Sequence, residues 1–124
     1  VKGSLIANGC VIGQGSVIEN SVIGVRTMIG PNVTIRNSIV MGCDYYDGDA
    51  ESRDVAFEIG EGSVIDGAII DKNISMGKGV RIVNDSKRVE TNLEHPVCVI
   101  RDSIPIVIKN SVLADGWDLE KEIS

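Results

Sequence analysis

Aromatic residues are scarce in this chain, because one Trp, two Tyr and one Phe make up only 3% of its 124 residues. The core must therefore be built from aliphatic and small side chains. No apolar run approaches the roughly 20 residues that span a membrane, and no charged start leads into an apolar stretch as in a signal peptide. We therefore expect no membrane partner, and the length predicts one domain with a single core.

Cysteine and positive charge are also limited. The three cysteines, Cys10, Cys43 and Cys98, are odd in number and have no metal-like spacing. They are typical of a reduced cytosolic chain rather than of a disulfide framework. The formal net charge of −6 argues against nucleic acid or an anionic membrane as the main partner.

A repeat of about six residues dominates what is present. Two series of aliphatic residues lead the units: Ile6, Ile12, Ile18, Ile23, Ile29, Ile35 and Met41, then Ile59, Ile65, Ile70, Met76 and Ile82. One unit in each series has only five residues, after Ile18 and after Ile65. The segments "IGQGSVIENSVIG" and "IGEGSVIDGAIID" therefore align, which argues against a chance repeat.

The repeat unit has a physical explanation. Its first and fifth residues lie four apart, so both point to the same side of a strand and face inward. Its fourth residue is usually Gly or Asn, which tolerate the left-handed backbone region that a sharp corner needs; Arg26 departs from this rule. Three such sides predict a coil of about 18 residues, stacked about 4.8 Å apart, in an all-β, single-stranded parallel β-helix.

Two segments interrupt the repeat, so the single domain 1–124 divides into five parts. We expect repeats over 5–42, an acidic loop over 43–58, repeats over 59–82, an excursion over 83–103 and a final coil over 104–119. Within the excursion, "PVCVIR" is rich in strand-forming residues. In the final coil, alignment of "IVIKNSV" with "SVIENSV" predicts that Ile108 faces inward as Ile18 does.

Two lysines lie in otherwise aliphatic stretches. Lys72 is the third residue of the unit "IDKNIS", a corner position that points outward, and Lys109 follows the predicted inward Ile108. Neither side chain needs to be buried. On the residues alone, a solvated corner charge explains both lysines.

Four segments in order along the chain carry a family resemblance: "SVIGVRTMIG", "IVMGCDYYDGDAESR", "AIIDKNISMGKGVRIVN" and "VIRDSIPIVIKNSVLADG". They resemble the C-terminal domain of glucose-1-phosphate adenylyltransferase, the ADP-glucose pyrophosphorylase family of plant and cyanobacterial type. The likeness covers nearly the whole chain. It implies a left-handed β-helix, whereas the general crossover rule favours right-handed connections.

The resemblance implies a parent enzyme that joins ATP and glucose 1-phosphate to give ADP-glucose and pyrophosphate for glycogen or starch synthesis. Catalysis and magnesium binding would belong to an N-terminal domain of that parent. The chain has no glycine-rich phosphate loop between a strand and a helix, and it opens in mid-repeat, so we expect an inactive fragment with no catalytic residue, metal or cofactor of its own. A cytoplasmic location, or a plastid in a plant, is expected.

The same resemblance implies a regulatory role. In this family the β-helix domain helps to assemble a tetramer and contributes to a site for phosphorylated effectors. The two activator lysines of the family map onto Lys72 and Lys109, and Arg26 and Arg81 are further candidates. A lysine ammonium group meets a phosphate as a mobile point charge. The chain departs from the family at Asp102-Ser103 and at Pro105, which affects the surroundings of Lys109.

Alternative functions remain open at this point. The chain could be a purely structural β-helix domain of another sugar nucleotidyltransferase. A hexapeptide-repeat acyltransferase would need a histidine base, but the one histidine, His95, falls in the excursion. A carbonic anhydrase of this fold needs three histidine ligands, so the count excludes it.

Overall fold

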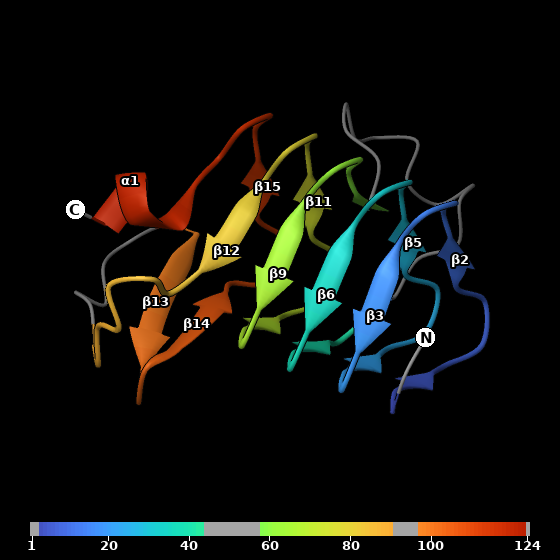
Figure 1. Cartoon of the computed structure of the whole chain (residues 1–124), viewed down its shortest axis with the longest axis horizontal. Helices are drawn as coiled ribbons and strands as arrows, with labels where there is room; N and C mark the ends of the chain where they lie inside the picture. The colour runs from blue at the N-terminus through green and yellow to red at the C-terminus, as the bar shows by residue number, and fades with distance from the viewer. Residues whose placement is uncertain (1–2, 44–57, 91–96, 124) are drawn as a thin grey trace.

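The computed structural model describes residues 3–43, 58–90 and 97–123. Its coils stack along the long axis of the molecule, with β1 to β3 near one end and α1 at the other (Figure 1). The strands of the first two coils are β1 (Leu5–Ile6), β2 (Val11–Ile12), β3 (Val17–Glu19), β4 (Val22–Ile23), β5 (Met28–Ile29) and β6 (Thr34–Arg36). The next two coils contain β7 (Ile39–Val40), β8 (Glu58–Ile59), β9 (Val64–Asp66), β10 (Ile69–Ile70), β11 (Ser75–Met76) and β12 (Arg81–Val83). The last elements are β13 (Cys98–Arg101), β14 (Ile104–Val107), β15 (Val112–Leu113) and α1 (Leu119–Ile123).

Three faces surround the core. The first face has the strand order β1-β4-β7-β10-β14-β13, and the third face has the order β12-β9-β6-β3. The second face consists of β2-β5-β8, followed by β11-β15. All pairs are parallel except that of β13 with β14. The predicted all-β parallel β-helix is therefore confirmed, with one antiparallel strand that closes an edge.

The coil is 17 residues long, rather than the predicted 18 or so. Leu5 pairs with Val22, and Val22 pairs with Ile39. The first series forms two coils, and each of them contains one five-residue unit. The prediction of a single short unit in this series was therefore wrong. Val40 takes the inward position there and is 4% exposed, whereas Met41, predicted to lead a unit, is 44% exposed.

The interior is aliphatic, as the shortage of aromatic residues predicted. Ile18, Ile35, Ile65 and Ile82 lie in register on the third face, and each is at most 1% exposed. Buried hydroxyl groups satisfy the backbone between coils: the Ser38 hydroxyl accepts from the Ala68 N–H at 3.1 Å and donates to the Arg36 carbonyl at 2.6 Å. Among the described residues, no buried side-chain polar atom lacks a hydrogen-bond partner.

The corners have the predicted left-handed backbone. Asn32, Asn73 and even Arg26 have φ near +60°. A second glycine position was not predicted from the sequence. A Cβ at Gly60 would lie 2.2 Å from the Gly77 carbonyl oxygen of the next coil, so the unit needs glycine there for close stacking.

The C-terminal end differs most from the sequence prediction. Val107 pairs with Ile70 and is fully buried, whereas Ile108, predicted to face inward, is only half-buried. Asp102 and Ser103 both have positive φ and form the two-residue turn of the β13–β14 hairpin. The helix α1 contacts β12 and buries Leu119. No helix in the described part of the chain is long and apolar enough to cross a membrane.

Candidate functional site: a lysine corner

The two lysines occupy equivalent positions in adjacent coils. The register that pairs Ile70 with Val107 also brings the corner that follows β14 onto the corner that follows β10. The Asn110 N–H donates to the Lys72 carbonyl at 3.0 Å, so Lys109 and Asn110 stack on Lys72 and Asn73. We call these four residues the lysine corner. Neighbouring strands lie about 4.8 Å apart, so the two lysine backbones are within reach of one small anion.

The asparagines give this corner its shape. Asn73 and Asn110 have φ of +61° and +66°, values that asparagine tolerates better than most residues. The Asn73 Nδ2 donates to Asn110 Oδ1 at 3.2 Å, which joins the two coils through their side chains. The Asp71 carboxylate accepts from the Lys72 N–H at 2.7 Å. Lys72 is half-buried and Lys109 is exposed, so the corner presents both side chains from a rigid backbone.

Arg26 lies on the same edge of the prism, and Arg81 does not. Arg26 stacks on the coil of Asn8, and its Nε donates to the Cys43 carbonyl at 3.0 Å. Along this edge, the corner of Cys43 lies between the corner of Arg26 and the corner of Asn73. The structure therefore brings Arg26, Lys72 and Lys109 to one edge.

Arg81 belongs to β12 on the third face, where its guanidinium forms a bidentate ion pair with Asp85. This hydrogen bonding lowers the pKa of the Asp85 carboxyl below its usual value and raises the pKa of Arg81. Asp118, near α1, also pairs with the Arg81 backbone. Arg81 therefore lies apart from the lysine corner, in a structural ion pair.

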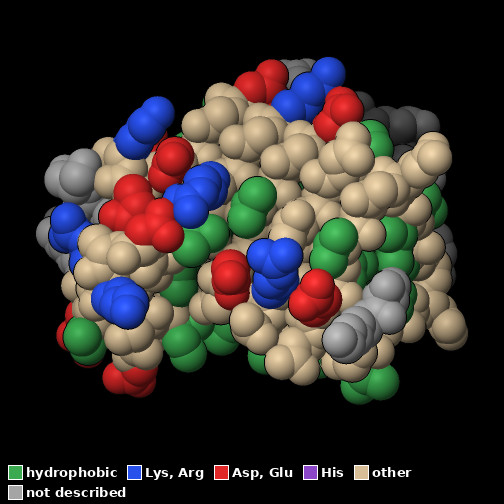
Figure 2. Space-filling model, viewed as in Figure 1, with side chains coloured by type: hydrophobic (Ala, Val, Ile, Leu, Met, Phe, Trp, Pro, Cys, Tyr) green, Lys and Arg blue, Asp and Glu red, His purple; other side chains and the backbone are tan. Residues whose placement is uncertain are grey.

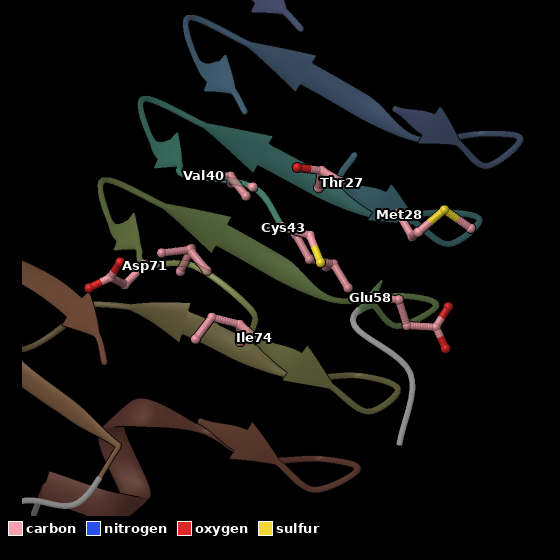
Figure 3. A pocket seen from close by; sticks show the side chains of 10 residues that line it. Thr27, Met28, Val40, Cys43, Glu58, Asp71 and Ile74 are labelled. Carbon is pink, nitrogen blue, oxygen red and sulfur yellow. The ribbon is translucent and has the colours of Figure 1, made fainter. Parts of the chain in front are cut away.

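A small cavity lies behind the lysine corner, inside the coil (Figure 3). Cys43 and Val40 border it on one side, and Asp71 and Ile74 border it on the next coil. Its volume of about 20 Å³ has room for a water molecule but not for a phosphorylated sugar. Any effector of that size would therefore meet the lysines from the outer surface of the corner.

A second polar corner joins the third face to the first and has mixed charge. Glu19, Arg36 and Asp66 stack in register there, and the Glu19 carboxylate lies 4.0 Å from the Arg36 guanidinium. Figure 2 shows acidic and basic side chains beside one another over this side of the molecule. We call this the mixed-charge corner. Opposite charges alternate along it, in contrast to the two lysines of the lysine corner.

Other reactive groups do not form a site in the described residues. Cys98 is fully buried, and burial raises the pKa of its thiol to about 11. Among residues 3–43, 58–90 and 97–123, no three His, Cys, Asp or Glu side chains come together as metal ligands would. His95 and residues 44–57 of the acidic loop lie outside the described residues.

The stacked parallel sheets define the class of the domain, which is a parallel β-helix. Comparison with protein families then identifies the family within this class. The model of the GLGC left-handed parallel beta-helix domain matches residues 1–117. The chain belongs to this family, as its resemblance to the C-terminal domain of glucose-1-phosphate adenylyltransferase implied. This match also shows that the helix is left-handed.

Proposed function

We propose that this chain is the regulatory and assembly domain of a glucose-1-phosphate adenylyltransferase, and that the lysine corner binds a phosphorylated effector. The observation that carries the proposal is the stacking of Lys72 on Lys109, fixed by the hydrogen bond from the Asn110 N–H to the Lys72 carbonyl. Membership of the GLGC domain family supports the parent enzyme.

The chemistry of the lysine corner suits a phosphate group. Two ammonium groups on adjacent coils can attract one anion from two sides. Charge-assisted hydrogen bonds to phosphate oxygens are stronger than neutral ones. Because the chain as a whole has a net charge of −6, a local pair of lysines is a favourable place for an anion. Arg26, on the same edge, adds a third positive charge.

The first face supports a role in docking and assembly. Its outward column consists of Leu5, Val22, Ile39, Ile69, Ile106 and Val99, which lie in register across six strands. Leu5 is 72% exposed and Ile39 is 46% exposed. An exposed aliphatic column on a parallel sheet is typical of a face that another element covers. We assign this face to the N-terminal catalytic domain of the parent and to the contacts of a homotetramer.

The reaction itself is assigned to the rest of the parent enzyme. ATP, glucose 1-phosphate and Mg²⁺ would bind to the N-terminal domain, and this segment would make no ADP-glucose alone. The lysine corner borders the first face, so an effector bound there could bias the arrangement of the two domains. The parent would act in the cytoplasm, or in a plastid if it is of plant origin.

Single substitutions in the full-length enzyme test the proposal. Lys72→Ala and Lys109→Ala should each raise the activator concentration for half-maximal effect about ten- to hundredfold, because each removes a charge-assisted contact of about 1.5–3 kcal/mol. Turnover without activator should change little. Lys121→Ala, on α1, which packs against β12 of the third face rather than at the lysine corner, is the matched control.

The competing candidate is a structural β-helix that binds no effector, favoured by the fact that corner lysines are commonly solvated. If both lysine variants respond to phosphorylated effectors as the wild type does, this structural role is correct. Turnover of ATP and glucose 1-phosphate by the isolated chain would instead show that the active site has been placed in the wrong domain.

A further inference from the structure

A groove lies at the end of the mixed-charge corner, beside the β13–β14 hairpin. Asp66 and Gly67 border it on one coil, residues of the segment 83–87 border it on the next, and Ser103 and Pro105 border it on the hairpin. We call it the hairpin groove. Its volume of about 490 Å³ lies within the range of pockets that hold small ligands.

A glycine keeps the hairpin groove open. The register of β3, β6, β9 and β12 stacks the residues that follow these strands, which are Asn20, Asn37, Gly67 and Asn84. Gly67 has no side chain, and a Cβ there would meet no atom within 4 Å beyond its chain neighbours. The column of asparagine side chains is therefore interrupted at Gly67, and the groove occupies the gap.

Two opposite charges line the hairpin groove without pairing. One oxygen of the Asp66 carboxylate accepts from Asn37 Nδ2 at 3.2 Å, and the other has no partner within the described residues. The Lys87 N–H donates to the Asn84 carbonyl at 3.1 Å, so the backbone of Lys87 is held in a turn. Its ammonium group has no hydrogen-bond or ion-pair partner in the described parts of the chain.

The neighbouring polar groups are already satisfied. Asp85 is neutralised by its bidentate ion pair with Arg81. Asn84 Nδ2 donates to the carbonyls of Arg88 and Ser103 at 2.8 and 3.1 Å, and Asn84 Oδ1 accepts from the Arg88 N–H. Asn84 therefore holds the loop to the hairpin, and the unpaired ammonium and carboxylate are the charges left for a ligand.

We propose that the hairpin groove binds a small zwitterion of the class of free aliphatic amino acids. The carboxylate of the ligand meets the Lys87 ammonium, its ammonium meets the Asp66 carboxylate, and Val83 and Pro105 contact its aliphatic part. An anion alone would face the carboxylates of Asp66 and Asp85, and a cation alone would face Lys87, so neither satisfies both charges. This site is independent of the lysine corner.

Titration of the 124-residue chain with L-leucine, followed by nuclear magnetic resonance, tests the proposal. The backbone resonances of Gly67, Asn84 and Ser103 should shift together and saturate. Isocaproate lacks the ammonium group of leucine, and isoamylamine lacks its carboxylate. Each should bind about two- to fivefold more weakly than leucine, as expected for the loss of one partly exposed ion pair.

Two variants assign the charges. Asp66→Asn keeps an oxygen that accepts from Asn37 and removes the negative charge, so it should bind leucine and isocaproate equally well. Lys87→Gln should bind leucine and isoamylamine equally well. Glu19→Gln is the matched control, because Glu19 lies in the same column as Asp66 but does not line the groove, and it should keep both preferences.

The outcomes are distinct. Wild-type chain that binds isocaproate as tightly as leucine would overturn the proposal, since Asp66 would then have no role. The absence of saturating shifts, or preferences that persist in both variants, would show that Asp66 and Lys87 are solvated surface charges. Lys109→Ala should bind leucine as the wild type does, so failure of the lysine corner leaves this test intact.

Discussion

The lysine corner and the mixed-charge corner share a backbone conformation but differ in their charge pattern. Each places an asparagine in the left-handed region, and each joins coils through side-chain amides. They differ in the residue that precedes the asparagine. The mixed-charge corner alternates Glu19, Arg36 and Asp66, whereas the lysine corner stacks Lys72 on Lys109.

Under the proposed function, this difference separates a stabilising pattern from one that binds an anion. Opposite charges in register stabilise neighbouring strands by roughly 0.2–1 kcal/mol, and like charges are destabilising. The Glu19–Arg36 contact of 4.0 Å therefore needs no ligand. Under the proposed function, two lysines in register would gain stability from a bound anion instead. The comparison predicts that phosphate acts on one corner and leaves the other unchanged.

The largest effect should come from the core that supports both corners. Ile29→Asp places a charge at a position only 3% exposed and forfeits about 1.5–3 kcal/mol of apolar burial as well. The domain should unfold, and both corners should be lost together. Circular dichroism at increasing temperature measures this, with Val11→Asp as the control because Val11 is 54% exposed on the neighbouring strand. A stable Ile29→Asp domain would show that the core has been assigned incorrectly.

Reversal of one charge at each corner should change the free energy of unfolding less than Ile29→Asp does. The change should have opposite signs at the two corners. Arg36→Glu stacks three like charges at the mixed-charge corner and should lower the free energy of unfolding by up to about 1–2 kcal/mol. Lys109→Glu gives the lysine corner an alternating pair, so it should raise stability slightly and abolish phosphate binding. Urea unfolding with and without phosphate distinguishes these results. Equal responses of both variants to phosphate would remove the distinction between the corners.

The smallest effect is expected at the hairpin that leads into the lysine corner. Asp102 and Ser103 have φ of +49° and +68°, which glycine adopts with less strain. Ser103→Gly should therefore raise the free energy of unfolding by about 0.5–1 kcal/mol, measured by urea unfolding. Phosphate binding should stay the same, because the hairpin only supports the corner. A destabilised variant would mean that the Ser103 side chain makes a contact that outweighs the strain.

The repeat made most of the fold predictable. Its inward residues and its glycine or asparagine corners follow from strand geometry and backbone sterics. The register was harder, because Ile39, Val40 and Met41 are all apolar and sequence spacing alone cannot choose among them. Only the pairing of Val40 with Ile23 and Ile70 decides which residue is buried.

The site was predicted in its residues but not in its geometry. Lys72 and Lys109 were identified by resemblance, yet the predicted inward Ile108 placed them at unlike positions. The antiparallel strand β13 fixes β14 so that Val107 is inward instead, and this shift brings the lysines into register. The direction of that strand depends on a hairpin turn, and the repeat contains no information about it. Arg81 was grouped with the lysines on charge alone, although Asp85 holds it on another face.

A phosphate titration that observes every backbone N–H of the 124-residue chain tests the central claim most directly. We predict that the resonances of Lys72, Asn73, Lys109 and Asn110 shift together with one saturating dissociation constant, while those of Glu19, Arg36 and Asp66 stay in place. Shifts of equal size at both corners, or none at the lysine corner, would contradict the claim that the stacked lysines form an anion site.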